Sequence, residues 1–284
     1  MLTKSHRIAV LMACYNRVEM TLRSLETLYR AAVCEIDVFL VDDGSLDATG
    51  EKVRARFPNV HIIQGSGDLY WSRGMNLAWK TAVEGLSAGQ KYDFFLWLND
   101  DVVLKADAID TAMCDWAKCG DPYGVVVGVC SKDSSEVESS YSATTIRDRQ
   151  LFPNGVSPQR ADGWFNGNFV LVPWETYCKV GMISDEYRHS RGDYDYAERL
   201  KSAKVPFFAS SRFVGVCVND YFCKTEGLRL FKRISLLFQP GYWNIRDLFI
   251  FRRKYWGVGR AVVSVCHLIV HVIFMHTRES RNSR

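Results

Sequence analysis

Two adjacent carboxylates, Asp100 and Asp101, are the side chains in this 284-residue sequence that most clearly suggest chemistry. They follow residues 94–98, an apolar run typical of a strand buried on both faces. Open α/β sheets bind ligands at the carboxyl ends of such strands. Neighbouring aspartates require a positive charge nearby, and a divalent cation carrying a phosphorylated ligand supplies one. An alternative is that one of them caps the helix expected from Ala106.

A second acidic pair, Asp193 and Asp195, falls in the first turn of a helix expected to follow a loop that carries His189. The helix macrodipole favours negative charge in a first turn, so capping explains this pair as readily as a functional site does. His189 is either a ligand contact beside the pair or an ordinary surface histidine.

Alternating strands and helices in the first half of the chain position the first pair of carboxylates. The expected strands cover residues 8–14, 36–41, 60–64 and 94–98, and the expected helices cover 18–29, 47–57, a stretch through 77–83, and 106–118. A polar, glycine-containing loop is expected at residues 65–74. This alternation predicts right-handed β-α-β crossovers and a mostly parallel sheet in an α/β fold.

Three of these four strands end in polar or acidic turns on the same side of the sheet, which predicts one crevice there. The side chains expected to line it are Tyr15, Asp43, Asp68, Arg73, Asp100 and Asp101. No G-x-G-x-x-G follows the first strand and no G-x-x-x-x-G-K-[ST] occurs. The main sequence evidence for a dinucleotide-binding dehydrogenase or a P-loop protein is therefore missing. Phosphates would be held differently, and a metal on Asp101 is the candidate.

The alternation weakens in the second half of the chain. Residues 131–163 are polar and predict irregular strands and a mobile loop, after a strand at 125–129. Further strands are expected at residues 168–172 and within 207–218, with a short helix at 174–180.

The charge distribution and the cysteines limit which binding partners and which cellular compartment fit this sequence. Residues 228–284 hold eleven Lys or Arg and two acidic residues, although the whole chain carries a net charge of only +4. Such a basic tail on a mildly acidic body favours a negatively charged partner, either a lipid surface or nucleic acid. Nine cysteines without a C-x-x-C pair, and an N-terminus without a signal-peptide pattern, predict a cytosolic protein with reduced thiols.

The tail itself has two parts. Residues 228–251 alternate basic with apolar and aromatic residues, which is typical of an interfacial helix on an anionic leaflet. Residues 261–275 are apolar but shorter than the roughly 20 residues needed to cross a bilayer. Shallow insertion, packing on the preceding domain and contact with a second subunit in a homodimer remain open. The expected boundary separates a domain at 1–227 from the tail at 228–284.

Four ordered motifs over about residues 6–225 resemble a family 2 glycosyltransferase of the GT-A fold. They are Ala13-Cys14-Tyr15-Asn16-Arg17, Val41-Asp42-Asp43-Gly44-Ser45, Asn99-Asp100-Asp101 at the D-x-D position, and Gly192-Asp193-Tyr194-Asp195. Within the family, Gly67–Trp71 and Asn166–Asn168 are similar to segments of bacterial rhamnosyltransferase-like enzymes of surface polysaccharide assembly. The resemblance implies a GT-A domain with a nucleotide-binding half at about 1–105 and an acceptor-binding half at 106–227.

The resemblance also implies roles for single residues. Asp43 would accept from a pyrimidine N3–H, Asp100 would contact the ribose, and Asp101 would ligate Mg²⁺ or Mn²⁺. Asp193 would be the general base, its pKa lowered by the helix N-terminus, with Asp195 as the second candidate. The other implied contacts are Ala13, Tyr15, Arg17, Asp68, Trp71 and Arg73 for the nucleotide sugar, and Trp164, Asn166 and His189 for the acceptor.

The implied activity is inverting, metal-assisted transfer of one sugar from UDP or dTDP to a lipid-linked glycan at the cytoplasmic face of a bacterial membrane, with no nucleic-acid partner. Two positions depart from the family: Asn99 is neutral, and Asn219 or Asp220 stands where a late histidine is common. These departures keep open a catalytically degenerate, glycan-binding or scaffold protein. A sugar nucleotidyltransferase would need a G-x-G-x-R loop, which Tyr15-Asn16-Arg17 is not.

Overall fold

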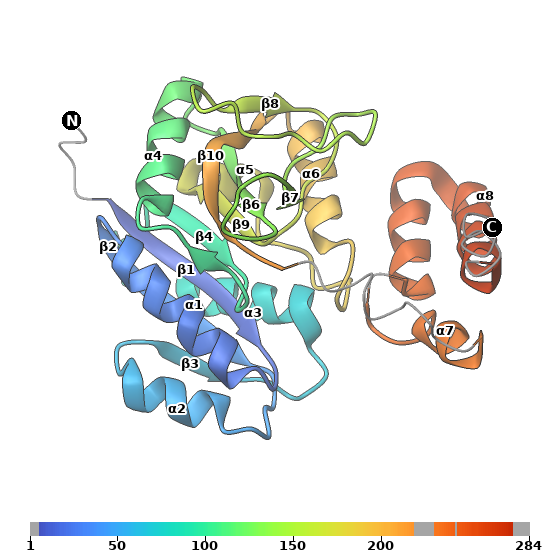
Figure 1. Ribbon diagram of the computed structural model, residues 1–284, viewed down its shortest axis with the longest axis horizontal. Helices are drawn as coiled ribbons and strands as arrows, with labels where there is room; N and C mark the ends of the chain where they lie inside the picture. The colour runs from blue at the N-terminus through green and yellow to red at the C-terminus, as the bar shows by residue number, and fades with distance from the viewer. Residues whose placement is uncertain (1–5, 219–229, 242, 275–284) are drawn as a thin grey trace.

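A mixed β-sheet covered by helices on both faces forms the body of the protein in the computed structural model, which describes residues 6–218, 230–241 and 243–274 (Figure 1). Its strands are β1 (Arg7–Cys14), β2 (Glu35–Asp42), β3 (His61–Gln64), β4 (Phe94–Leu98), β5 (Val103–Leu104), β6 (Val125–Ser131), β7 (Ser139–Tyr141), β8 (Gln159–Ala161), β9 (Phe169–Pro173) and β10 (Phe207–Val216). Its helices are α1 (Val18–Ala31), α2 (Thr49–Arg56), α3 (Tyr70–Glu84), α4 (Ala108–Cys119), α5 (Trp174–Val180) and α6 (Gly192–Ser202). The C-terminal segment adds α7 (Leu230–Leu236) and α8 (Ile245–Phe274).

The strand order is β3-β2-β1-β4-β9-β6-β10-β5, with β7 beside β6 and β8 beside β10. The pairs β3–β2, β2–β1, β1–β4 and β6–β10 are parallel, as the α/β pattern predicts. Strand β9 is antiparallel to both of its neighbours, β4 and β6. It therefore begins at the edge where β1, β2 and β4 end, and this brings the loop before it to the same edge.

Apolar side chains alternate between the two faces of the sheet and bury both. In β1, Ile8 and Val10 pack with α1 and α4, whereas Ala9 and Leu11 pack with α3 and α6. Every residue of β4 is buried, which confirms the strand expected from the apolar run. Two layers of helices thus fix the edge of the sheet that follows Leu98.

Helix α3 begins earlier than the sequence predicts, so the expectation of a loop through residue 74 is wrong. Both oxygens of the Asp43 carboxylate accept backbone N–H groups, one from Gly67 at 2.8 Å and one from Tyr70 at 2.8 Å. The second of these N–H groups belongs to the first residue of α3. Asp43, 27 residues upstream, therefore caps the helix so that it starts at Tyr70. No sequence pattern near residue 70 indicates this start.

The segment between β6 and β9 has the short, irregular strands that its polar sequence predicts. Strands β7 and β8 have three residues each, and isolated bridges join Ala143 to Phe165 and Thr144 to Gln150. The bridge to Phe165 brings this segment beside residues 166–168, which precede β9.

The C-terminal segment forms two helices, the second of which breaks at Gly257, where φ is 82° and ψ is 169° (Figure 1). Before the break, Phe251 and Asp247 are buried. After the break, Val272 packs with Leu237 and Trp243 beside α7. By length and composition α8 could cross a membrane, and 11% of its most apolar window is buried.

We predict that Asp115→Ala destabilises the fold, because Asp115 ties α4 to an irregular stretch of β10. Its buried carboxylate accepts from the Ser211 backbone N–H at 2.7 Å and from the Ser211 hydroxyl at 2.8 Å. Removing the acceptor leaves a buried N–H unpaired, which costs about 1–3 kcal/mol. Urea denaturation measures this loss. The control is Asp110→Ala on the same helix, whose effect should stay within about 0.5 kcal/mol; equal losses in the two variants would contradict the prediction.

Candidate active site

A cavity of about 1350 Å³ opens at the edge where β1, β2 and β4 end and β9 begins. Many of the residues singled out in the sequence line it, from segments far apart in the chain. Those expected near a nucleotide or metal are Ala13, Tyr15, Arg17, Asp43, Trp71, Asp100 and Asp101, and those expected near an acceptor or its proton are Asn166, His189 and Asp193.

Asp68 and Arg73 do not line this cavity, although the sequence pattern placed both in the crevice. Asp68 is exposed and accepts from the Ser66 hydroxyl at 2.5 Å. Arg73 lies on α3, and its Nε donates to the backbone carbonyl of Asp185 at 3.0 Å. The early start of α3 explains the position of Arg73. The helix fixes the direction of this side chain, which therefore points away from the cavity.

Trp164 and Asp195 also lie outside the cavity lining. The Trp164 ring stacks on Tyr194 with ring centres 5.1 Å apart, and its Nε1 donates to Glu198 at 2.7 Å. Asp195 is fully buried on α6, where its carboxylate has several protein donors. Both residues therefore support the wall formed by α6 and do not face the opening.

Arg17 bridges the two carboxylates that follow β4. Its Nη1 lies 3.1 Å from Asp100 Oδ1 and 3.0 Å from Asp101 Oδ2. Burial raises the pKa of Asp100 to about 7, against the opposing effect of Arg17, and the charge of Asp101 adds to the rise. One wall of the cavity therefore carries two neighbouring carboxyl groups, and the guanidinium of Arg17 lies against both.

These residues fit a divalent cation bound together with a phosphorylated ligand. The second carboxylate oxygen of Asp100 is buried and has no hydrogen-bond partner, and Asp101 lines the cavity beside it. Among the described residues no cluster of three or more His, Cys, Asp or Glu side chains could hold a metal. Mg²⁺ sites commonly use one or two carboxylates, with phosphate oxygens and water completing the shell. Asn219 and Asp220, expected near the late-histidine position, lie outside the described residues.

Asn99 has a specific partner that accounts for its side-chain amide. Its Oδ1 accepts from the indole Nε1 of Trp71 at 2.7 Å. The Trp71 ring in turn covers Gly167, where a Cβ would lie 2.3 Å from the ring. Asn99 therefore seats Trp71 at the cavity wall, between the carboxylates after β4 and the loop before β9, a role that the sequence pattern did not reveal.

Asp193 faces the cavity from the first turn of α6. Its Oδ2 accepts from the Gly167 backbone N–H at 3.2 Å, and its Oδ1 accepts from the N–H of Tyr194 at 2.9 Å. Burial raises the pKa of Asp193 to about 6, outweighing these N–H groups and the charge of Arg191. The expectation of a lowered pKa is therefore wrong, because desolvation exceeds the effect of the helix N-terminus. A carboxylate with this pKa is ionised at neutral pH and strong enough to accept a proton.

His189 is exposed to the cavity from the loop before α6. Its backbone N–H donates to Asp247 Oδ2 at 3.3 Å, and its carbonyl accepts from the Ser72 hydroxyl at 3.3 Å. Helices α3 and α8 therefore hold the backbone of this loop from two sides, which leaves the imidazole at the cavity.

The cavity thus combines a carboxylate–guanidinium cluster suited to a metal-bound phosphate with a half-buried carboxylate, Asp193, suited to proton transfer. Contacts through Asn99, Trp71 and Gly167 join the two groups. Such a site can accept a proton at one end and bind a charged leaving group at the other.

Comparison with known proteins identifies the family of this chain. The model of glycosyl transferase family 2 matches residues 9–174, more than half of the chain. An N-acetylglucosaminyl-diphospho-decaprenol L-rhamnosyltransferase of Mycobacterium tuberculosis, from strains CDC 1551 / Oshkosh and ATCC 25618 / H37Rv, is 26% identical over 207 residues. That alignment covers 64% of this chain and 66% of the length of the relative.

Solved structures share the fold at low sequence identity. The mannosyltransferase PcManGT from Pyrobaculum calidifontis, in complex with GDP-Man and Mn²⁺, superposes with a TM-score of 0.54 at 15% identity, over 95% of this chain and 70% of the other. S. aureus TarS 1–349 superposes with a TM-score of 0.51 at 11% identity, over 94% of this chain and 81% of the other. Together with the family match, the strand order and the cavity, these similarities show that the chain has the GT-A fold and belongs to glycosyl transferase family 2.

Proposed function

We propose that this glycosyltransferase moves one sugar, with inversion, from a UDP- or dTDP-sugar to a lipid-linked glycan. The observation that carries the proposal is Asp193, a half-buried carboxylate with a pKa of about 6 in the same cavity as the Asp100–Arg17–Asp101 cluster. An inverting transfer needs a base near the acceptor oxygen and positive charge near the leaving diphosphate.

On the donor side, Asp101 would hold Mg²⁺ or Mn²⁺, with Asp100 beside it. The cation would supply Lewis-acid stabilisation of the charge that develops on the leaving diphosphate. Arg17 would meet the phosphates from the position it now shares with both carboxylates. Asp43 keeps acceptor capacity beyond its two backbone N–H bonds, because a carboxylate can accept about four hydrogen bonds. It would use this capacity for the N3–H of a pyrimidine, with Tyr15 packing near the ring.

On the acceptor side, Asp193 would take the proton of the attacking hydroxyl. The acceptor oxygen then forms a bond to the anomeric carbon while the bond from that carbon to the nucleotide diphosphate breaks on the opposite face. The Gly167 N–H holds Asp193 Oδ2 toward the loop before β9. Asn166 and His189, which line the same cavity, would contact the acceptor sugar or its phosphates.

The substrate class and the location rest on further support. The mycobacterial relative transfers L-rhamnose to N-acetylglucosaminyl-diphospho-decaprenol, as its name states. This favours dTDP-rhamnose as the donor and a polyprenyl-diphosphate sugar as the acceptor. Such an acceptor lies in a membrane, and α8 exposes an apolar surface after its break, formed by Val258, Val262, Val263, Val270 and Phe274. We therefore place the protein at the cytoplasmic face of an anionic bacterial membrane.

The donor site is tested by calorimetric titration of UDP, dTDP, GDP and CMP with and without Mn²⁺. We expect UDP or dTDP to bind in a metal-dependent manner, and Asp101→Ala to remove the metal dependence because it deletes the carboxylate that would hold the ion. Glu51→Ala, which changes an exposed carboxylate on α2, should bind as the wild type does. If none of the four nucleotides binds the wild type in either condition, the transferase proposal fails and a scaffold role takes its place.

The base is tested by Asp193→Asn and by the pH dependence of transfer. Loss of the base should lower kcat by about 10²–10⁴-fold while nucleotide binding is retained. In the wild type kcat/KM should fall below pH 6, because protonation of a group with a pKa of about 6 removes the base. This limb should vanish from the residual activity of Asp193→Asn. Asp185→Asn, at an exposed carboxylate, is the control; an unchanged kcat in Asp193→Asn would assign the base elsewhere.

Membrane binding is tested with vesicles of phosphatidylglycerol and with neutral vesicles of phosphatidylcholine. Val263→Asp puts a charge at a side chain that is 69% exposed on α8, and we expect it to weaken co-sedimentation with the anionic vesicles. Val33→Asp, at a position of similar exposure far along the chain, should leave sedimentation unchanged. Stronger binding to DNA than to anionic vesicles at matched salt would instead favour a nucleic-acid partner.

A further inference from the structure

Asp195 has four side-chain partners and lies in the same turn of α6 as the proposed base, Asp193. This fully buried carboxylate lies two residues after Asp193 in the first turn of α6. Tyr187 and Tyr255 donate their hydroxyls to it at 3.2 and 2.8 Å, and Arg199 and Lys254 lie 2.9 Å from its oxygens.

Two of these four partners, Lys254 and Tyr255, come from α8, whereas Tyr187 and Arg199 belong to α6 or to the loop before it. The Tyr255 hydroxyl also lies 3.2 Å from the Asp195 backbone carbonyl, so it contacts both the side chain and the main chain of this turn. Burial and the charge of Asp195 raise the pKa of Tyr255, which keeps the phenol protonated as a donor. Helix α8 therefore supplies both a neutral and a charged donor to the turn.

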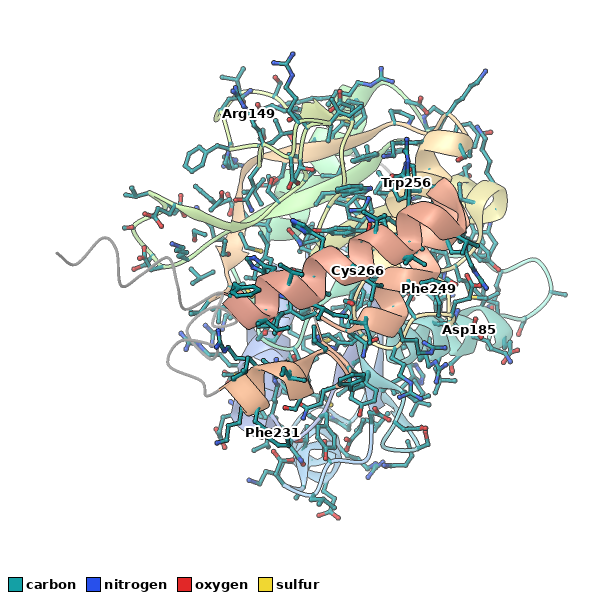
Figure 2. The ribbon with its side chains drawn as sticks, turned by 90° about the vertical axis from the view of Figure 1, so that its right-hand side faces the viewer. Arg149, Asp185, Phe231, Phe249, Trp256 and Cys266 are labelled. Atoms are coloured by element: carbon teal, nitrogen blue, oxygen red, sulfur yellow. The ribbon has the colours of Figure 1, made fainter. Side chains whose placement is uncertain are left out.

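The same helix also holds the loop that precedes α6. The buried carboxylate of Asp247 accepts from the backbone N–H of Arg188 at 3.2 Å and of His189 at 3.3 Å. Lys254 pairs with Glu186 at 2.8 Å. Figure 2 shows α8 running from Trp256 past Cys266 across the face of the molecule turned to the viewer. The part of α8 before its break thus contacts both ends of the chain segment that carries His189 and Asp193.

Movement of this turn would displace the carboxylate of Asp193 directly. Asp195 and Asp193 belong to one helical turn, in which the Asp195 N–H donates to the Arg191 carbonyl at 2.8 Å. On its other side the turn is confined by α3, because a Cβ on Gly192 would lie 2.4 Å from Ser72 Oγ. The turn is therefore confined between α3 and α8, and in this position Asp193 accepts from the Gly167 N–H.

We infer that Tyr255 and Lys254 of the C-terminal helix are positioning residues that act through Asp195 to hold Asp193 in its reactive orientation. The inference rests on the proposed role of Asp193 as the base. It extends that role by making the C-terminal helix α8 part of the machinery for the proposed reaction.

A simpler role for α8 would be to cover apolar surface, with Tyr255 packing through its ring against Phe251 and Trp256. Tyr255→Phe separates the two roles, because it removes the hydroxyl and keeps the ring. Lys254→Met is a second variant, because it removes the charge and keeps most of the stem. Tyr196→Phe is the matched control: it makes the same chemical change on α6, at a hydroxyl that donates to the Gly181 carbonyl at 3.2 Å.

Transfer from dTDP-rhamnose to a polyprenyl-diphosphate N-acetylglucosamine is the kinetic readout. We expect Tyr255→Phe to lower kcat by about tenfold to a hundredfold, the scale of a misplacement of about 1 Å. The donor KM and the calorimetric stoichiometry of nucleotide binding should not change. Lys254→Met should lower kcat in the same direction. Tyr196→Phe should reduce the unfolding temperature and leave kcat unchanged.

A carbon-13 carboxyl titration supplies a readout that needs no substrate, with the Asp193 signal assigned from Asp193→Asn. The charged and titratable groups around the turn are Arg191 near Asp193, and Tyr187, Arg199, Lys254 and Tyr255 around Asp195, with Glu186 and Glu198 beyond them. Loosening the turn admits water to Asp193. We therefore expect its pKa to fall from about 6 toward the ordinary carboxyl value in Tyr255→Phe, and to stay in Tyr196→Phe.

The two readouts separate failure of this inference from failure of the proposed function. If the wild type transfers no sugar, the function fails, whereas a shifted Asp193 titration in Tyr255→Phe still supports the coupling. If Tyr255→Phe keeps the wild-type kcat and the wild-type titration, the inference is overturned. A fall in kcat matched by an equal fall in binding stoichiometry also overturns it, because it shows loss of folded protein.

Discussion

Negative charge buried at one edge of the sheet is the constraint on which the rest of the structure depends. Because β1, β2 and β4 point the same way, their carboxyl ends bring several aspartates together, and each needs donors once water is removed. Backbone N–H groups donate to Asp43 and a guanidinium pairs with Asp100, whereas Asp195, buried on α6 behind the cavity wall, has donors from α8. Each solution joins segments far apart in the chain, so compensation of the charge also fixes the tertiary arrangement.

Much of the fold was predictable because its signals are local. The buried runs that became β4 and β9, and the helical spacing of α1 and α4, lie within single segments. Two features were not predictable in this way. The start of α3 depends on Asp43, a partner 27 residues before Tyr70. The reversed direction of β9 depends on the neighbours it finds in the sheet, and the residues of a strand do not encode its direction.

The cavity was predictable at strand ends and less so on helices. Tyr15, Asp43 and Asp101 line it because a residue that ends a parallel strand must lie at that edge. The direction of a helical side chain depends on where the helix starts, since each residue turns it by about 100°. Arg73 on α3 thus points to the loop that contains Asp185. Asp195, two residues after Asp193, faces the protein interior.

The pKa of Asp193 shows how tertiary structure can reverse a local expectation. A first-turn position lowers the pKa of a carboxyl group, yet burial raises this one to about 6. Gly167 before β9 donates to this carboxylate, α3 packs against Gly192 in the same turn, and α8 contacts Asp195 two residues later. The basicity available for proton transfer therefore depends on tertiary contacts of the α6 turn, which the local sequence around Asp193 does not reveal.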